Sequence, residues 1–545
     1  MIKLTTLVLL LAAFFLVLTL YIAPQQGAFI PSTTINASNL NTADARLQEE
    51  IPIQEVNMDS QGRSIFFAVT LFGHIQLANL VMGGSWILLI TELLFRRTRK
   101  DRYNMLGKSM SLFSVILFTV GGTFGGAALL YTYSLYPAFT LNMFHIYWWP
   151  IFATLLFWGT QIFFLYMYFY NWKRLGTGWH IGLGLGYAVA SFFQALSITT
   201  MDSGMLTPNN PGIRWGYTGI FTMDLRTLFS WWFNPTLWNL QFHRLGAAIA
   251  YFGFLMAALA MFHHQVNKEN PDAMKYWDWV GSYGLLWGLA GLAVQPLLGF
   301  LYARQIMDNS SGAFQMIMTG PRAWEFLWVV ALISTLVLTS LIYFIDRRET
   351  ILNKRETRKV SNILKVMLVV AAASAFILVN PGWLGDVFMF GPTAWANPLG
   401  NMKYKYVALG LLSFVSISVI AIDSIILKNE REDDWGNLPK SSKVAAIFAG
   451  ILGMWIVMAM GFVRESARAP WLVWNIIPIA GGTAYPTPIS FSFIFIIWGG
   501  LLIFFLAAFW YVSKVTSESP PNPGAGLPKV SESEEDENNQ PSRGE

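Results

Sequence analysis

Residues 443–471 read KVAAIFAGILGMWIVMAMGFVRESARAPW, an apolar run that ends in charged residues. The part from 443 to 462 has the length and hydropathy of a transmembrane helix. Arg464, Glu465 and Arg468 follow at its end, ahead of a proline–tryptophan pair. Ionisable side chains at bilayer depth are costly and usually face a cavity, a partner or a cofactor. The stretch therefore predicts a membrane helix with a functional site at its end.

The composition extends this prediction to the whole chain. Its 545 residues are 54% hydrophobic and 12% charged, and apolar runs of helical length recur throughout. Such runs exceed a transmembrane β-strand and lack its two-residue alternation, so they indicate a polytopic all-α membrane bundle. The net charge of +5 is spread over the loops and disfavours nucleic acid as a partner. The absence of cysteine excludes disulfides, thiolate iron–sulfur ligation and covalent haem attachment through Cys-x-x-Cys-His.

About twelve membrane spans are predicted. The first lies in residues 1–24, which we interpret as a retained N-terminal anchor, with a signal peptide as the alternative. Residues 25–64 are predicted to be an external polar loop, and 514–545 a disordered acidic tail. The predicted spans are 4–23, 65–95, 108–132, 147–171, 180–200, 243–263, 279–301, 324–345, 361–379, 405–427, 443–462 and 489–512.

Basic residues gather in alternate loops, which predicts the orientation of the chain. The basic loops include 96–102, 347–359 and 428–443, and we assign them to the cytoplasm. Both termini are then cytoplasmic. The same orientation places five residues near the outer face: His74, His145, His243, Met402 and Glu465. The span assignment does not use these residues, so their convergence is informative.

Histidines near the outer ends of two spans suggest haem. Haem iron takes axial ligands such as imidazole or thioether, and its propionates pair with cations at the wet edge. His243 opens a span and has Arg244 beside it for a propionate, or else it bonds to the outer loop. His74 lies a few turns inside its span, where a neutral core histidine bonded to a backbone carbonyl is the alternative.

The remaining candidates have similar alternatives. Glu465 is either a weak axial ligand that leaves iron high-spin, or a member of an exposed ion pair with Arg464 and Arg468. His145 is a spare candidate at the interface. We interpret the other three histidines, His180, His263 and His264, as residues that snorkel at the cytoplasmic helix ends.

Several motifs occur in a defined order along the chain. They are Leu71-Phe-Gly-His74, Ile87-Leu-Leu-Ile-Thr-Glu92, Asn171-Trp-Lys-Arg-Leu-Gly176, Asp202-Ser-Gly-Met-Leu-Thr-Pro-Asn209, Asn234-Pro235 before Phe242-His243, and Phe462-Val-Arg-Glu465-Ser-Ala-Arg-Ala-Pro-Trp471. In this order and spacing, over most of residues 60–515, the chain resembles subunit I of the cytochrome bd quinol oxidases of prokaryotic cytoplasmic membranes.

The resemblance implies roles for individual residues. His243 is similar to the axial ligand of the low-spin haem b, and His74 to a ligand at the oxygen-reacting centre. Glu465 resembles the carboxylate ligand of the high-spin haem b, with Arg468 as a propionate partner. Met402 is the thioether nearest to the family's methionine position. Two or three haems are implied, of b type, with haem d as a further option.

The chain also departs from the family pattern. Gln161 and Ala153 stand where the family has two acidic residues used for proton delivery and for the oxygen-reactive haem. Residues 303–403 are predicted to hold two additional spans in place of the family's quinol-binding loop. The haem-binding core would then comprise residues 65–302 and 404–513.

The resemblance implies a subunit of a quinol:oxygen oxidoreductase that passes electrons from membrane quinol through haems to oxygen. Its expected partners are a second helical membrane subunit, lipid and quinone. A non-oxidase haem-b cytochrome that relays electrons between the quinone pool and a peripheral enzyme is the alternative. A transporter is a third class, but the sequence shows no inverted repeat.

Overall fold

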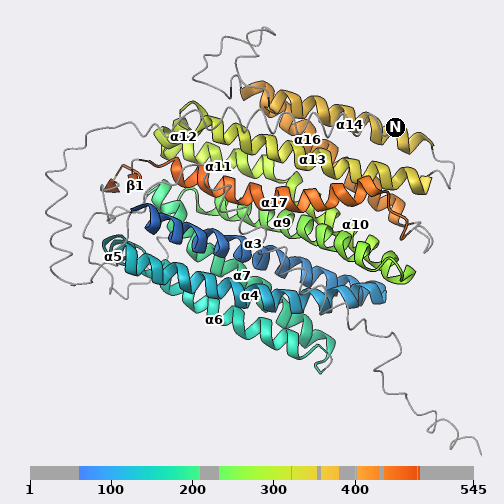
Figure 1. Cartoon of the computed structure of the whole chain (residues 1–545). Helices are drawn as coiled ribbons and strands as arrows, with labels where there is room; N and C mark the ends of the chain where they lie inside the picture. The colour runs from blue at the N-terminus through green and yellow to red at the C-terminus, as the bar shows by residue number, and fades with distance from the viewer. Residues whose placement is uncertain are drawn as a thin grey trace, which may run out of the picture. The chain divides into compact units, whose positions relative to one another are not determined.

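The computed structural model describes residues 60–172, 174–208, 232–320, 322–352, 358–379, 399, 402–428, 435–469, 471–475 and 477–478. All belong to the first of two compact units, residues 1–498. They form a bundle of long α-helices with one two-stranded antiparallel sheet (Figure 1). The elements are α3 (Ser60–Thr98), α4 (Asp101–Leu135), α5 (Pro137–Ile146), α6 (Trp148–Tyr170), α7 (Thr177–Leu206), α9 (Leu237–Val266), α10 (Pro271–Ala293), α11 (Gln295–Asn309), α12 (Ser311–Met318), α13 (Ala323–Leu352), α14 (Arg358–Val379), α16 (Met402–Lys428), α17 (Lys440–Ser466), β1 (Trp471–Val473) and β2 (Ile477–Pro478).

These helices confirm the predicted membrane architecture. Ten stretches of the described chain are long and apolar enough to cross a membrane, and they coincide with the ten predicted spans between residues 65 and 462. The protein is a multi-pass integral membrane protein. The predicted spans 4–23 and 489–512, the tail 514–545 and nearly all of the loop 25–64 lie outside the described residues.

The predicted span 279–301 contains a helix break. α10 ends at Ala293 and α11 begins at Gln295, with Pro296 in the first turn of α11. Proline lacks the N–H that a helix interior needs, but it is tolerated in a first turn, where that N–H would have no partner. The break allows α11 to pack against α9 beside His243.

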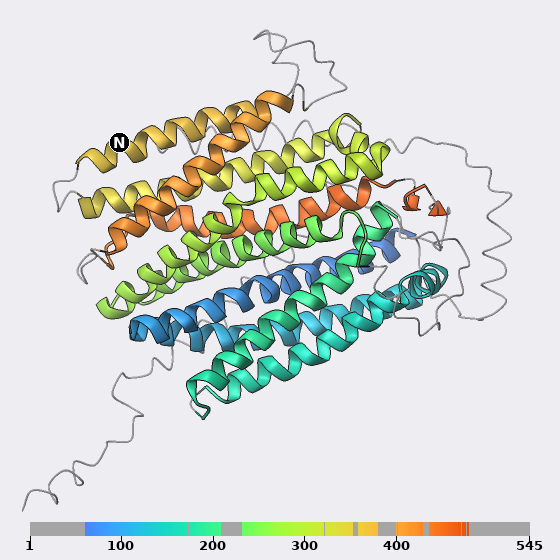
Figure 2. The ribbon, with the colours of Figure 1, turned by 180° about the vertical axis from the view of Figure 1, so that it is seen from behind.

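The helices form neighbouring layers (Figures 1 and 2). α4 packs on α3, and α6 packs on α7, which also lies against α3. α9 lies between α3, α10 and α17, and α13 packs against α17 on one side and α14 on the other. Nearly all of the apolar window of α13 is buried. α13 was predicted as an additional span, yet it is a direct neighbour of the helix that carries Glu465.

Glycines bring α9 and α10 into close contact. A Cβ atom on Gly253 would lie 2.4 Å from the backbone nitrogen of Gly288, and one on Gly291 would lie 2.6 Å from the backbone oxygen of Gly246. Atoms cannot approach this closely, so only glycine allows this separation of the two backbones. The contact positions α9, the helix that carries His243.

Replacing Gly253 by alanine is expected to lower the free energy of unfolding by about 1–3 kcal/mol, because the α10 backbone must move. Gly126→Ala is the matched control, since a Cβ there meets nothing within 4 Å. Thermal unfolding of the purified protein in detergent measures both variants. Equal melting temperatures would contradict the close approach.

Candidate functional site

The last turn of α17 holds a carboxylate between two guanidinium groups. Arg464 Nη2 donates to Glu465 Oε1 at 2.5 Å, and Arg468 Nη2 donates to Glu465 Oε2 at 2.6 Å. Arg468 is buried and also donates to the backbone oxygen of Leu472 at 2.5 Å, which fixes its direction. The Glu465 side chain is 41% exposed, so the structure shows the predicted ion pair and leaves the carboxylate accessible.

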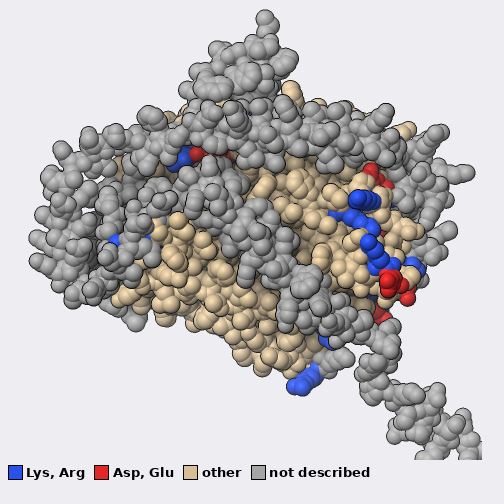
Figure 3. Space-filling model, viewed as in Figure 1, with Lys and Arg blue, Asp and Glu red and all other residues tan. Residues whose placement is uncertain are grey.

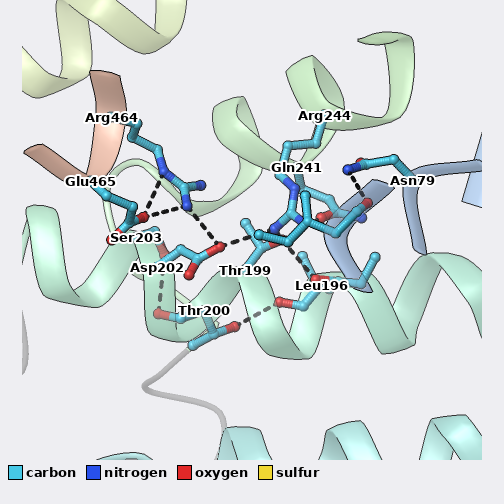
Figure 4. A network of polar contacts seen from close by, with 12 residues as sticks. Asn79, Leu196, Thr199, Thr200, Asp202, Ser203, Gln241, Arg244, Arg464 and Glu465 are labelled. Carbon is cyan, nitrogen blue, oxygen red and sulfur yellow. Dashed lines mark hydrogen bonds and ion pairs between the residues drawn. The ribbon is translucent and has the colours of Figure 1, made fainter. Parts of the chain in front are cut away.

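Asp202, from the end of α7, joins this cluster to α9. Its Oδ2 atom accepts from Arg464 Nη2 at 3.2 Å and from Arg244 Nη1 at 3.1 Å (Figure 4). Arg244 also donates to Thr199 Oγ1 at 2.6 Å. We call Asp202, Arg244, Arg464, Glu465 and Arg468 the outer network. Three guanidinium groups and two carboxylates leave it one positive charge.

The sequence interpretation used Asp202 only as part of a motif and missed its role in the site. The available signal was an acidic residue at the predicted end of a membrane span, which is as costly there as Glu465. Its partners lie on two other helices, so the sequence could not name them.

Buried hydrophobic residues pack close to the outer network. Tyr147, between α5 and α6, is fully buried in a cluster with Met205, Leu472 and Val473. Burial raises the pKa of the Tyr147 hydroxyl, while the charge of Arg468 lowers it and that of Asp202 raises it. Tyr147 is therefore a neutral phenol at physiological pH.

His243 has an unused ring nitrogen. Its Nδ1 atom is buried and has no hydrogen-bond partner among the described residues. Its ring stacks on Tyr302 of α11 with centroids 6.3 Å apart, and a Cβ on Gly299 would lie only 3.4 Å from its Cε1. Buried polar atoms are normally paired, so this imidazole nitrogen is available to bind water or a ligand.

His74 presents one ring nitrogen for binding. Its Nδ1 lies 2.9 Å from the backbone oxygen of Gly121, and because a carbonyl only accepts, Nδ1 carries the hydrogen. A neutral ring then has its lone pair on Nε2. This arrangement fits the predicted core histidine, and it equally fits a metal ligand oriented by a backbone carbonyl. Gly125 allows the contact, since a Cβ there would lie 2.7 Å from His74 Cε1.

The structure brings most of the predicted site residues together. Glu465, Arg468 and Arg244 belong to one network, His243 adjoins Arg244 in sequence, and His74 lies within electrostatic range of Arg244. Met402 opens α16, a helix that packs mainly on α14 and α10, and its side chain lies outside what the structure describes. One turn later, Tyr406 contacts Phe300 of α11.

These side chains fit haem. The unpaired nitrogen of His243 and the free Nε2 of His74 are suitable iron ligands, and the positive charge of the outer network suits a propionate. The half-exposed carboxylate of Glu465 is a further oxygen donor.

Two residues of α6 occupy the positions at which the sequence is predicted to depart from the family pattern. Gln161 is buried, and its Nε2 has no partner among the described residues. Ala153 is also buried. No side chain at either position can transfer a proton as a carboxylic acid does.

The interpretation of His180, His263 and His264 as snorkelling residues was wrong, because all three are buried. His263 stacks on Trp277 with centroids 4.1 Å apart, and His264 Nε2 donates to the backbone oxygen of Gly436 at 3.1 Å. His180 pairs with Glu92 at 2.8 Å. Tertiary contacts cover these rings, whereas hydropathy reports only their place near a helix end.

The described residues form a bundle of membrane-crossing helices with histidines and a paired carboxylate at one end. The family model described as cytochrome bd terminal oxidase subunit I matches residues 63–317. This match assigns residues 63–317 to that family. The matched part includes His74, His243 and Asp202.

A solved structure shares the fold. The bd oxidase from Geobacillus thermodenitrificans matches with a TM-score of 0.52 and 17% sequence identity, over 85% of this chain and 99% of that chain. At this identity the likeness supports the fold alone. A search of curated proteins found no match.

Replacing Asp202 by asparagine is expected to lower the free energy of unfolding by about 1 kcal/mol, because two guanidinium groups lose their shared carboxylate. The control is Asp308→Asn, which breaks an exposed pair with Arg304 of similar length, 3.0 Å, and should change stability by less than about 0.5 kcal/mol. Urea or thermal unfolding in detergent compares them. Equal effects would show that the bridge between α7, α9 and α17 is energetically unimportant.

Proposed function

We propose that this chain is the haem-bearing membrane subunit of a quinol:oxygen oxidoreductase. The observation that supports the proposal most directly is the convergence of His74, His243 and the outer network, all within one end of the bundle. The family match adds to it, since the family is one of terminal oxidases.

In this proposal His243, His74 and Glu465 hold haem iron, and Arg244 and Arg468 pair with propionates. Two or three haems are expected, of b type, with haem d as a further option. Met402 is the proposed thioether partner of His243. Its support is that α16 contacts α11 at Tyr406 and Phe300, and the same helix α11 covers His243.

Bound haem would supply one-electron transfer and the reduction of oxygen. The protein would hold each ligand in position: the Gly121 carbonyl orients His74, and Leu472 together with Glu465 orients Arg468. Asp202 keeps Arg244 and Arg464 close to one another despite their like charge. The overall reaction oxidises two quinols to quinones and reduces one oxygen to two waters, with four protons taken up and four released.

The distribution of basic residues on the surface supports the proposed orientation in the membrane. On the face shown in Figure 3, most lysines and arginines gather at the end opposite the outer network, where α4, α10 and α17 begin. That asymmetry supports cytoplasmic basic loops in a prokaryotic membrane, with haems near the outer face. α6 exposes many large apolar side chains, which suits contact with lipid or with a second helical subunit.

Two side chains of α6, Gln161 and Ala153, favour a second function. Gln161 and Ala153 cannot supply protons, so the chain could instead be a haem-b cytochrome that relays electrons between the quinone pool and a peripheral enzyme.

One assay on the purified complex distinguishes the two functions. An oxidase should show haem bands in the reduced-minus-oxidised spectrum and consume oxygen when quinol is added. Haem bands without oxygen consumption would support the relay. A protein without haem bands would contradict both.

Replacing His243 by alanine is expected to abolish the low-spin haem signal in the same spectrum, since the iron loses its imidazole ligand. Phe242→Ala is the control, because that side chain is an exposed neighbour on the same helix. Full retention of the low-spin signal in the histidine variant would show that haem is held elsewhere.

A further inference from the structure

A second cluster of ionisable groups lies at the opposite end of the bundle from the outer network. Glu92 of α3 and His180 of α7 are both buried, and Glu92 Oε1 lies 2.8 Å from His180 Nδ1. The other carboxylate oxygen accepts from the Tyr168 hydroxyl at 2.8 Å. Arg96, which is 26% exposed, donates to Glu92 Oε1 at 3.2 Å and links the pair to the surface.

The hydrogen-bond partners show where the protons must be. His180 Nε2 lies 3.1 Å from the backbone oxygen of Tyr168, which can only accept, so Nε2 carries a hydrogen. The contact between Nδ1 and Glu92 needs one further proton, because an imidazole lone pair and a carboxylate lone pair would repel. The Glu92–His180 pair therefore holds one proton that can reside on either atom.

A polar layer lies two helical turns nearer to the outer network, on all four helices of this part of the bundle. Its members are Ser85, Ser114, Gln161 and Tyr187, all of them buried. Ser85, Gln161 and Tyr187 are seven residues from Glu92, Tyr168 and His180 respectively, which is about 10 Å along each helix.

Several groups in the polar layer are unsatisfied. The Tyr187 hydroxyl lies beside Ser114, yet Tyr187 Oη, Ser114 Oγ and Gln161 Nε2 form no regular hydrogen bond with any described residue. Buried polar atoms of this kind usually bind water. On α4, Ser114 is a further two turns from Gly121, whose carbonyl holds His74. Polar groups thus extend from the pair toward His74.

We propose that the Glu92–His180 pair is the proton-loading group for oxygen reduction. It takes a proton from the side of the membrane where α3 ends, holds it between Oε1 and Nδ1, and releases it through water in the polar layer toward His74. Four such transfers, with four electrons from quinol, balance the conversion of one oxygen to two waters. This inference rests on the proposed function, and it assigns the task that Gln161 and Ala153 cannot perform.

Glu92→Gln separates this role from a structural one. In this variant the amide nitrogen takes the place of Oε1 and donates to His180 Nδ1, while the amide oxygen still accepts from Tyr168. The mobile proton is lost, together with the contact to the partly exposed Arg96. Tyr168→Phe is the matched control, because it removes one hydrogen bond and leaves the Glu92–His180 contact. We expect Glu92→Gln to keep its haem content and melting temperature but to lose at least about tenfold in oxygen consumption per haem. Tyr168→Phe should melt lower and keep most of its turnover.

An unchanged rate of oxygen consumption in Glu92→Gln would overturn the inference. A second readout does not depend on turnover: the reduced-minus-oxidised infrared difference spectrum should contain a carboxyl band in the wild type that Glu92→Gln lacks. A wild-type protein that binds haem without consuming oxygen would contradict the proposed function. In that case the infrared band would decide whether the pair gains or loses a proton when the protein is reduced. Absence of the band would also overturn the inference.

Discussion

Charged side chains at the ends of membrane helices are costly unless they are paired, and this constraint organises the outer network. Asp202 accepts from arginines on α9 and α17 at once, so one carboxylate ties three helices together at the end where the histidines lie. Glu465, the second carboxylate of the network, pairs with Arg464 and Arg468. The residual positive charge is what makes this end suitable for an anionic cofactor.

The same requirement is met differently at the other end. Glu92 is paired with a histidine and a partly exposed arginine, and Asp278 of α10 pairs with the buried Arg347 of α13. Arg347 also lies over the ring of Trp435, 3.8 Å from its centroid. Each cluster joins helices that are distant in sequence, so the ionic pairs specify which helices are neighbours as well as where protons reside.

Close packing gives these clusters their geometry. Glycine contacts hold α9 against α10, and the break at Pro296 lets α11 cover His243. α13 packs against α17 and supports the helix whose last turn holds Glu465. A site built on rigid helix ends in this way keeps ligands, guanidinium groups and a buried polar layer in fixed relation.

The amino-acid sequence determined the class of protein, the ten spans seen among the described residues, and the presence of ionisable residues at helix ends. Those features follow from the cost of placing each residue in lipid, which adds up along one helix regardless of its neighbours. Tertiary structure alone decided that Asp202 meets Arg244 and Arg464, that His180 is buried against Glu92, and that α13 lies beside α17. Such contacts depend on how each helix is rotated and crossed against the next, and hydropathy contains no information about either.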